Sequence, residues 1–299
     1  MDKSLSDIGR GAVPLRRVLK RVAFSIAGLV LAAAGFFSWQ SFYPVQAANG
    51  WSYRVLHEQV PKAASLAMLS DGAILVSQEL REGRGSIVRI DGPGERHEVL
   101  GGLSKPDGLI AARGGWVFSQ EVADKPVMFL DDGVVTPLFE GSGVQGLWDD
   151  GENLYAIEDR KHIGRLLRYN WQSQSVTVVR DNLDEAESIT RCPDGRMLYT
   201  KKAQGVVRVL AQDRSDPVLI GGLNQPTFLR CDERGLWINE DSTHRARLLL
   251  ITPQGKQQTI LSFLKAPQAV IATGNGSYLV AEGGRDRVLE LTPSDSTPR

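Results

Sequence analysis

Short apolar runs alternate with polar, turn-forming stretches over most of the chain, and the pattern repeats about every 40 residues. One clear copy is LSKPDGLIAARGG at 103–115, in which a polar start leads into an apolar run and a Gly-Gly turn. Gapless copies, a looser copy and a shortened copy follow the same pattern at 183–195, 223–235, 264–276, 60–72 and 141–151. Four short apolar runs per copy, separated by Gly-rich turns, are typical of the blades of a β-propeller.

We therefore predict an all-β fold, a six-bladed β-propeller over 51–299 that follows a single N-terminal transmembrane helix. The sixth repeat ends at Leu291 without a fourth strand, and the unused segment WSYRVLHEQV at 51–60 has the pattern of one. We expect this segment to close the ring, because closure protects sheet edges that would otherwise be exposed. The expected blades are 60–102, 103–141, 142–182, 183–222, 223–263, and 264–299 completed by 51–60.

The N-terminal region has the charge pattern of a membrane anchor. Residues 1–21 are rich in Lys and Arg, and no charged residue follows between Val22 and Arg54. The segment 22–42 is long enough to cross a hydrocarbon core of about 30 Å. Since basic flanks stay in the cytoplasm, we expect a cytoplasmic tail, a single-pass anchor in the inner (cell) membrane and a propeller on the extracytoplasmic, periplasmic side. The alternative is a signal peptide that is cleaved after Ala47.

The overall charge of the chain argues against a nucleic-acid partner. Lys plus Arg and Asp plus Glu both number 35, so the net charge is zero and we expect no nucleic-acid partner.

The only two cysteines, Cys192 and Cys231, follow an Arg in adjacent repeats. They are too few for a zinc cluster built from Cys. We favour buried free thiols, with a disulfide across the blades as the alternative.

Two sets of polar residues recur at fixed places in the repeats. In a propeller, the start of each first strand and the end of each second strand lie at the same mouth of the central tunnel. The first set is Ser65 (or Ala64 in the gapless frame), Asp107, Gln145, Glu187, Thr227 and Gln268. The second set lies fourteen residues further along and comprises Glu79, Glu121, Asp159, Lys201, Asp241 and Glu282. We expect the second set to contribute ligand-binding groups, and we expect an ion pair between Glu187 and Lys201.

Three members of the first set come from consecutive blades and have the donor atoms of a metal site. Asp107, Gln145 and Glu187 offer carboxylate and amide oxygens, which suit Ca²⁺ and can also hold another divalent ion such as Zn²⁺. The alternative is a solvated polar rim without a ligand, because strand ends at a water-filled mouth often carry Asp and Glu.

The motifs Pro106-Asp107-Gly108-Leu109, Ser119-Gln120-Glu121 and CPDGRMLYT at 192–200 resemble those of the SMP-30/gluconolactonase/strictosidine-synthase-like propellers. The resemblance covers about 51–299 and implies a divalent metal at the tunnel mouth and hydrolysis of a lactone or ester. It implies metal ligands of the types Glu, Asn and Asp at the starts of inner strands. Asp107 matches the family's Asp, Gln145 stands where an Asn is expected, and Glu187 is acidic at a comparable place. Ala64-Ser65 stands where the enzymes have Glu.

Two functions follow from these observations. One is a metal-dependent lactone or ester hydrolase in which Glu121 or His244 acts as the general base. The other is a non-catalytic propeller that binds a small molecule at the tunnel mouth or a protein partner at the membrane. The sequence contains no Gly-x-Ser-x-Gly, HExxH or Walker motif, so the hydrolases and nucleotide-binding proteins that use them are not supported.

Overall fold

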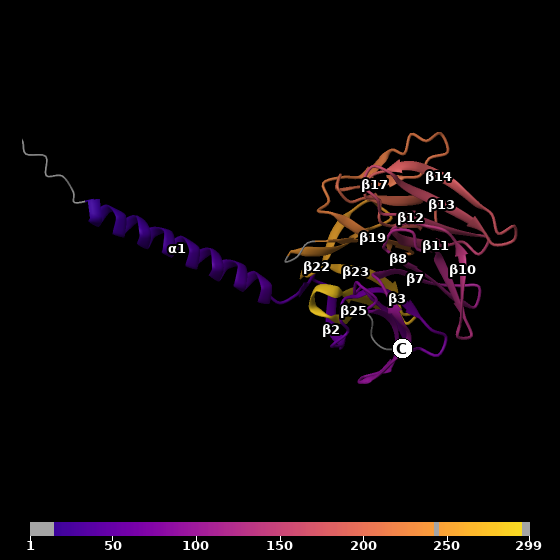
Figure 1. Cartoon of the computed structure of the whole chain (residues 1–299), viewed down its shortest axis with the longest axis horizontal. Helices are drawn as coiled ribbons and strands as arrows, with labels where there is room; N and C mark the ends of the chain where they lie inside the picture. Colours follow the sequence, from indigo (N-terminus) through magenta and orange to yellow (C-terminus); the bar gives the residue numbers. More distant parts are fainter. Residues whose placement is uncertain (1–14, 242–244, 295–299) are drawn as a thin grey trace, which may run out of the picture. The chain divides into compact units, whose positions relative to one another are not determined.

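The computed structural model describes residues 15–241 and 245–294, and the chain divides into two compact units, 1–44 and 45–299. The first unit contains one helix, α1 (Leu15–Phe42), drawn in indigo in Figure 1. Its stretch Leu15–Gln40 has a mean hydropathy of 1.9, and its apolar side chains are exposed. A helix of this length and composition is able to span a bilayer, and α1 contains the whole predicted segment 22–42.

The second unit is a six-bladed β-propeller of antiparallel sheets. The first blade contains β3 (Ala63–Met68), β4 (Ile74–Gln78), β5 (Gly85–Gly92) and β6 (Glu95–Leu103). The second contains β7 (Pro106–Ala112), β8 (Gly115–Gln120), β9 (Val127–Asp131) and β10 (Val134–Phe139). The third contains β11 (Val144–Asp149), β12 (Asn153–Glu158), β13 (Gly164–Asn170) and β14 (Val176–Leu183).

The remaining blades follow in chain order. The fourth contains β15 (Ile189–Arg191), β16 (Met197–Lys201), β17 (Val206–Val209) and β18 (Val218–Ile220). The fifth contains β19 (Pro226–Asp232), β20 (Gly235–Glu240), β21 (Ala246–Ile251) and β22 (Gln257–Leu264), with β1 (Gln46–Ala47) on its outer edge. The sixth contains β23 (Pro267–Ala272), β24 (Tyr278–Glu282) and β25 (Arg287–Pro293), and η1 (Gly283–Arg285) lies between the last two strands.

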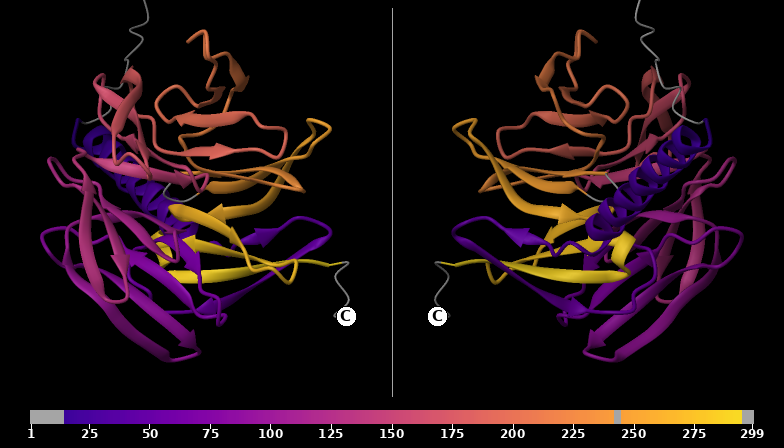
Figure 2. Two further views of the ribbon diagram at one scale, coloured as in Figure 1. Left: turned by 90° about the vertical axis from the view of Figure 1, so that its right-hand side faces the viewer. Right: turned by 90° about the vertical axis from the view of Figure 1, so that its left-hand side faces the viewer.

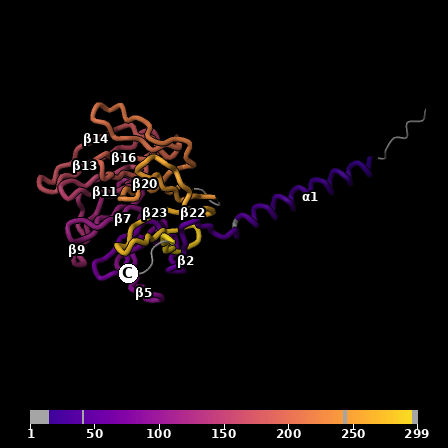
Figure 3. The backbone as a smooth tube through the Cα atoms, turned by 180° about the vertical axis from the view of Figure 1, so that it is seen from behind, coloured from indigo at the N-terminus to yellow at the C-terminus, as the bar shows by residue number. Residues whose placement is uncertain are grey.

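The ring closes as the sequence predicts. β2 (Trp51–His57) pairs antiparallel with β25, and Tyr53 stands opposite Leu291, so the indigo and yellow segments run side by side in Figure 3. The side views in Figure 2 place the first and last blades next to each other, and β3 contacts β23. The predicted six-bladed fold is therefore confirmed.

The propeller begins earlier in the chain than the repeats indicate. Val45 is buried in the core of the fifth and sixth blades, and its carbonyl accepts a hydrogen bond of 2.9 Å from the Tyr53 hydroxyl. Gln46 and Ala47 then pair with β22, opposite Ser262 and Leu261. The segment that precedes Trp51 is thus part of the folded unit, although it lies outside the repeat pattern that defined 51–299.

The two cysteines form a disulfide, so the expectation of free thiols is wrong. Cys192 and Cys231 are 39 residues apart, and their Cα atoms are 4.8 Å apart. Cys192 directly follows β15 and Cys231 lies near the end of β19, so both stand toward the same end of inner strands in adjacent blades. A single repeat period therefore brings the two thiols within bonding distance.

Candidate tunnel-mouth site

The inner strands of all six blades surround a cavity of about 350 Å³ along the propeller axis. Its polar end is formed by the expected set Ser65, Asp107, Gln145, Glu187, Thr227 and Gln268, all of which line the cavity. The structure therefore brings together residues that are as much as two hundred positions apart in sequence, because each begins an equivalent strand.

Two glycines allow the inner strands to approach closely at this end. A Cβ atom on Gly108 would lie 2.7 Å from the carbonyl oxygen of Gln145, and one on Gly146 would lie 2.4 Å from that of Glu187. No L side chain fits at these distances. The sequences Asp107-Gly108 and Gln145-Gly146 thus pair a polar side chain with the small residue that its tight surroundings require.

A repeated hydrogen bond positions the second polar set. A residue directly before the inner strand in five blades, and four residues before it in the fourth, has a positive φ between 43° and 63°. Its carbonyl accepts the N–H of the residue that follows the second strand, at 2.8–3.1 Å. The accepting residues are Lys62, Lys105, Gly143, Glu185, Gln225 and Ala266. The donating residues, which form the second ring of the mouth, are Glu79, Glu121, Asp159, Lys202, Asp241 and Gly283.

This ring differs from the predicted set in two blades, where Lys202 and Gly283 replace Lys201 and Glu282. The length of the hairpin loop between the first and second strands explains the difference. In blades one, four and six this loop is the longer one and comprises residues 69–73, 192–196 and 273–277. The corresponding stretches in the other blades are 113–114, 150–153 and 233–234. The longer loop changes the offset from fourteen to fifteen in blades four and six, whereas in blade one Ser65 rather than Ala64 lines the cavity.

Glu282 belongs to a different group of residues, the clamp carboxylates, which comprises Glu158, Glu240 and Glu282. Each lies at the end of a second strand with a fully buried side chain. Each accepts a backbone N–H from the preceding blade connection and pairs with an Arg of the third strand at 2.6–2.7 Å. The clamp carboxylates therefore stabilise the contacts between the second strand, the third strand and the preceding blade connection.

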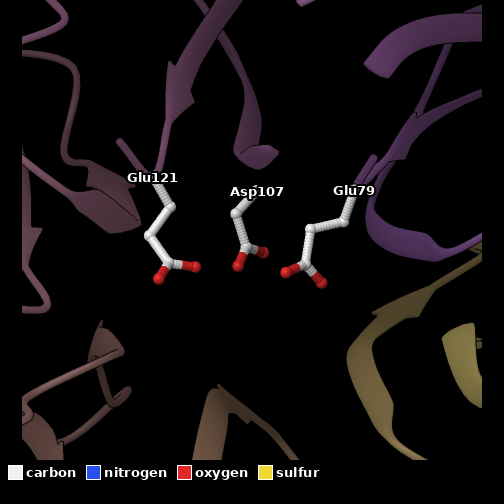
Figure 4. A group of neighbouring side chains, drawn as sticks. All are labelled: Glu79, Asp107 and Glu121. Atoms are coloured by element: carbon white, nitrogen blue, oxygen red, sulfur yellow. The ribbon is translucent and has the colours of Figure 1, made fainter. Parts of the chain in front are cut away.

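One half of the mouth holds a cluster of three carboxylates. Glu79, Asp107 and Glu121 offer oxygen atoms within 4.8 Å of one another, and Figure 4 shows Asp107 between the other two. The ammonium of Lys105 contacts Glu121 and lies 3.3 Å from Glu79 Oε1. Burial, followed by the charges of Glu79 and Glu121, raises the pKa of Asp107 well above its usual range despite this ammonium. The cluster therefore holds more negative charge than its lysine neutralises.

The other half of the mouth centres on Glu187. Lys202 Nζ lies 2.7 Å from Glu187 Oε1 and 3.1 Å from Asp241 Oδ2, so the predicted pair of Glu187 with Lys201 is wrong by one residue. Gln145 Nε2 donates to Glu187 Oε2 at 3.3 Å. Burial raises the pKa of Glu187 to about 8, although Lys202 opposes the shift.

Asp159 lies in the second ring between these two halves. Burial, together with the charge of Glu121, raises its pKa to about 6, and the ammonium groups of Lys202 and Lys105 oppose the change. Its protonation state thus changes close to neutral pH.

The donor atoms around Gln145 fit a hard divalent cation. Gln145 Oε1 is buried and has no hydrogen-bond partner in the described part of the chain. Its neighbours along the ring, Asp107 and Glu187, are buried carboxyl groups whose pKa values are raised chiefly by burial. An orphaned amide oxygen that lines one cavity with two buried carboxyl groups matches the kind of oxygen ligands that Ca²⁺ takes. Lys105 and Lys202 neutralise part of the charge from the outer side.

His244, the other candidate general base, lies outside the described residues. Sequence reasoning missed Lys105 and Lys202 as members of the site. Lys105 directly precedes the Pro-Asp start of an inner strand, but the equivalent residues of the other blades differ in type, so the repeat pattern does not single it out.

No family model matches the sequence, and no curated protein matches it. Solved structures do match. A gluconolactonase from Xanthomonas campestris has a TM-score of 0.66 at 13% identity, with 82% of this chain and 91% of that chain covered. A protein described as a putative gluconolactonase gives 0.64 at 11%, covering 84% and 98%. An auxiliary nutrient binding protein from Bacteroides thetaiotaomicron gives 0.61 at 14%, covering 78% and 69%.

These similarities establish the fold. The chain has the six-bladed propeller architecture of gluconolactonase-like structures, and the same architecture is present in a protein described by binding rather than by catalysis. Activity therefore has to be argued from the tunnel mouth itself.

Proposed function

We propose that the propeller binds a divalent cation at the tunnel mouth and hydrolyses a lactone or an ester there. The observation that carries this proposal is the buried, unpartnered Gln145 Oε1, which lines the same cavity as Asp107 and Glu187 on the inner strand of the intervening blade. An uncompensated acidic site of this kind is stabilised by a cation. The gluconolactonase architecture of two similar solved structures agrees with the reaction class.

Each residue has a distinct task in this proposal. Asp107, Gln145 and Glu187 hold the ion, which polarises a carbonyl oxygen and activates water when bound. Glu121, held toward Asp107 by Lys105, is the candidate general base that takes the proton of the attacking water. The cavity below the ring receives the rest of the substrate.

Metal content and hydrolysis of the full-length protein test the proposal together. Ca²⁺ and Zn²⁺ are removed with a chelator and restored, and turnover is followed on gluconolactone and on aryl esters. Asp107→Asn should lose both the bound ion and at least about a hundredfold of the turnover, as is typical when a major electrostatic contribution is removed. The matched control is Asp71→Asn, since Asp71 is an exposed hairpin residue paired with Arg89. Unchanged turnover in Asp107→Asn contradicts the hydrolase.

A second candidate is a binding propeller without turnover. The ammonium groups of Lys105 and Lys202 already lie among the mouth carboxylates, which favours a preformed recognition surface for a small molecule or a protein partner. A similar solved structure is described as a nutrient binding protein. This candidate expects a bound ion and ligand-induced thermal stabilisation, with no turnover on any lactone or ester.

We further propose that α1 is retained as a membrane anchor and that the propeller lies in an oxidising, extracytoplasmic compartment. The disulfide supports the compartment, since such bonds persist outside the reducing cytoplasm. The burial of Val45 and the pairing of β1 support retention, because cleavage after Ala47 would remove both from the propeller. Carbonate-resistant membrane association and an intact N-terminus by mass spectrometry are expected. A mature chain that begins at Ala48 contradicts retention.

A further inference from the structure

The cavity in the tunnel has a second end, which is basic. Arg191 and Arg230 line it, together with Trp148 and Ile271. Arg191 ends β15 and lies four residues beyond Glu187, which corresponds to about 13 Å for extended backbone at about 3.3 Å per residue. The cavity is therefore a narrow passage with carboxylates at one end and guanidinium groups at the other.

These two guanidinium groups are only weakly satisfied by the protein. Arg191 Nε donates to the Gly195 carbonyl at 3.4 Å, and no carboxylate within 15–241 or 245–294 forms an ion pair with Arg191. Arg230 Nε is buried and has no hydrogen-bond partner among the described residues. Asp232 Oδ2 lies 3.6 Å from Arg230 Nε, which is beyond hydrogen-bond distance.

The acidic residues nearby are engaged by other donors. Asp232 Oδ2 accepts hydrogen bonds of 3.0 Å from both the Trp237 indole and the Tyr278 hydroxyl. Asp149 accepts the Trp171 indole N–H at 2.6 Å, and Asp150 accepts backbone N–H groups of its own turn. Arg230 thus keeps a long ion pair with Asp232, while its Nε–H has no hydrogen-bond acceptor among the described residues.

The disulfide fixes the two arginines in place. Each Arg directly precedes one of the bonded cysteines, Cys192 and Cys231, whose Cα atoms are 4.8 Å apart. The backbone positions of Arg191 and Arg230 are therefore set before any ligand arrives. A preorganised site loses less conformational entropy when it binds.

We propose that this end of the tunnel binds an anionic group, a carboxylate or a phosphate, between Arg191 and Arg230. The inference deepens the proposed function and rests on it for the reaction, because it assigns the substrate class as a slender lactone or ester with an acidic terminus. The carbonyl lies at the carboxylate ring, and the acidic terminus lies about 13 Å away at the arginines. Guanidinium groups suit both anions because their N–H groups match two oxygen atoms at once.

Gluconate and glucitol form a matched pair of probes, since both are six-carbon polyols and only gluconate carries a carboxylate. Binding to the full-length protein in detergent is measured by calorimetry at low salt. Gluconate should bind more tightly than glucitol. Arg191→Gln and Arg230→Gln should each weaken gluconate binding about tenfold and leave glucitol binding unchanged. Equal binding of the two probes to the wild-type protein overturns the proposal.

The controls separate charge from folding and separate this site from the reaction. Arg196→Gln removes an exposed guanidinium that pairs with Asp194 on the neighbouring hairpin, and it should leave the preference for gluconate intact. Arg191→Lys should retain part of the preference, whereas a variant that merely misfolds would lose binding of both probes. An Arg-dependent preference in a protein without metal or turnover refutes the hydrolase and keeps the anion site. Turnover with a preference that does not depend on Arg191 or Arg230 refutes the anion site alone.

Discussion

Glu158 and Asp159 are neighbours in the chain, and so are Glu240 and Asp241, yet the members of each pair lie in different electrostatic surroundings. The clamp carboxylates Glu158 and Glu240 are fully buried, and each forms two short bonds to one Arg. Asp159 and Asp241 turn toward the tunnel mouth, where lysines and other carboxylates compete. The comparison teaches that burial alone does not mark a functional acid. The decisive feature is how completely its charge is compensated.

The largest difference is expected in stability. Glu240→Ala leaves the Arg247 guanidinium and the Asn224 N–H without their partner, so the free energy of unfolding should fall by about 3 kcal/mol. Asp241→Ala, one residue further, leaves Lys202 paired with Glu187 and should cost less than about 1 kcal/mol. Urea unfolding at pH 7 measures both. Equal losses in the two variants would remove the distinction between clamp and mouth.

The carboxyl groups of the tunnel mouth should also make the free energy of unfolding depend on pH. Because the pKa of Asp159 rises to about 6 and that of Glu187 to about 8, the folded protein binds more protons than the unfolded chain above about pH 4. Their contribution to stability is complete below the unfolded pKa and is lost as pH rises through the folded values. With a chelator present, the free energy of unfolding should fall by about 5 kcal/mol between pH 5 and 8.

Substitutions test whether this pH dependence of the free energy of unfolding arises from the carboxyl groups of the tunnel mouth. Asp159→Asn and Glu187→Gln should each flatten the dependence, whereas the exposed Asp71→Asn should leave it unchanged. A wild-type protein whose unfolding free energy rises across pH 5–8 would contradict the raised pKa values. Added Ca²⁺ should reduce the slope, because an ion compensates the charge that deprotonation creates.

A smaller effect concerns the lysine that competes for the acidic groups. Lys202→Met frees Glu187 and Asp241 from their ammonium, so Ca²⁺ should bind about threefold to tenfold more tightly. Lys201→Met removes the same charge one residue earlier, outside the ring, and should change the affinity less than twofold. Calorimetric titration compares the two. If both substitutions act alike, Lys202 is a general surface charge rather than a member of the site.

The sequence predicts the repeat architecture well, because each blade carries the same short strands and turns. It also places Asp107, Gln145 and Glu187 correctly at one end of the cavity, since equivalent strand starts share one face. The predicted residues of the second ring are wrong in two blades, the fourth and the sixth. The register of a hairpin depends on its loop length, and an added loop residue moves Lys202 into the place expected for Lys201.

Other features depend on distances that a single sequence does not contain. Glu282 has the residue type of a mouth ligand, but Arg287 of the adjacent strand binds it in the interior. The bond between Cys192 and Cys231 depends on the close approach of two inner strands. The roles of Lys105 and Lys202 emerge only when both polar rings are seen together around the tunnel.

Calorimetric titration of Ca²⁺ and Zn²⁺ into the metal-free, full-length protein tests the central claim most directly. The wild-type protein should bind one ion per chain. Gln145→Met, which keeps the size of the side chain and removes the orphaned amide oxygen, should weaken binding about tenfold or more. Asp71→Asn should bind as the wild type does. The absence of binding by either ion, or equal binding by the wild type and Gln145→Met, would contradict a cation site at the tunnel mouth.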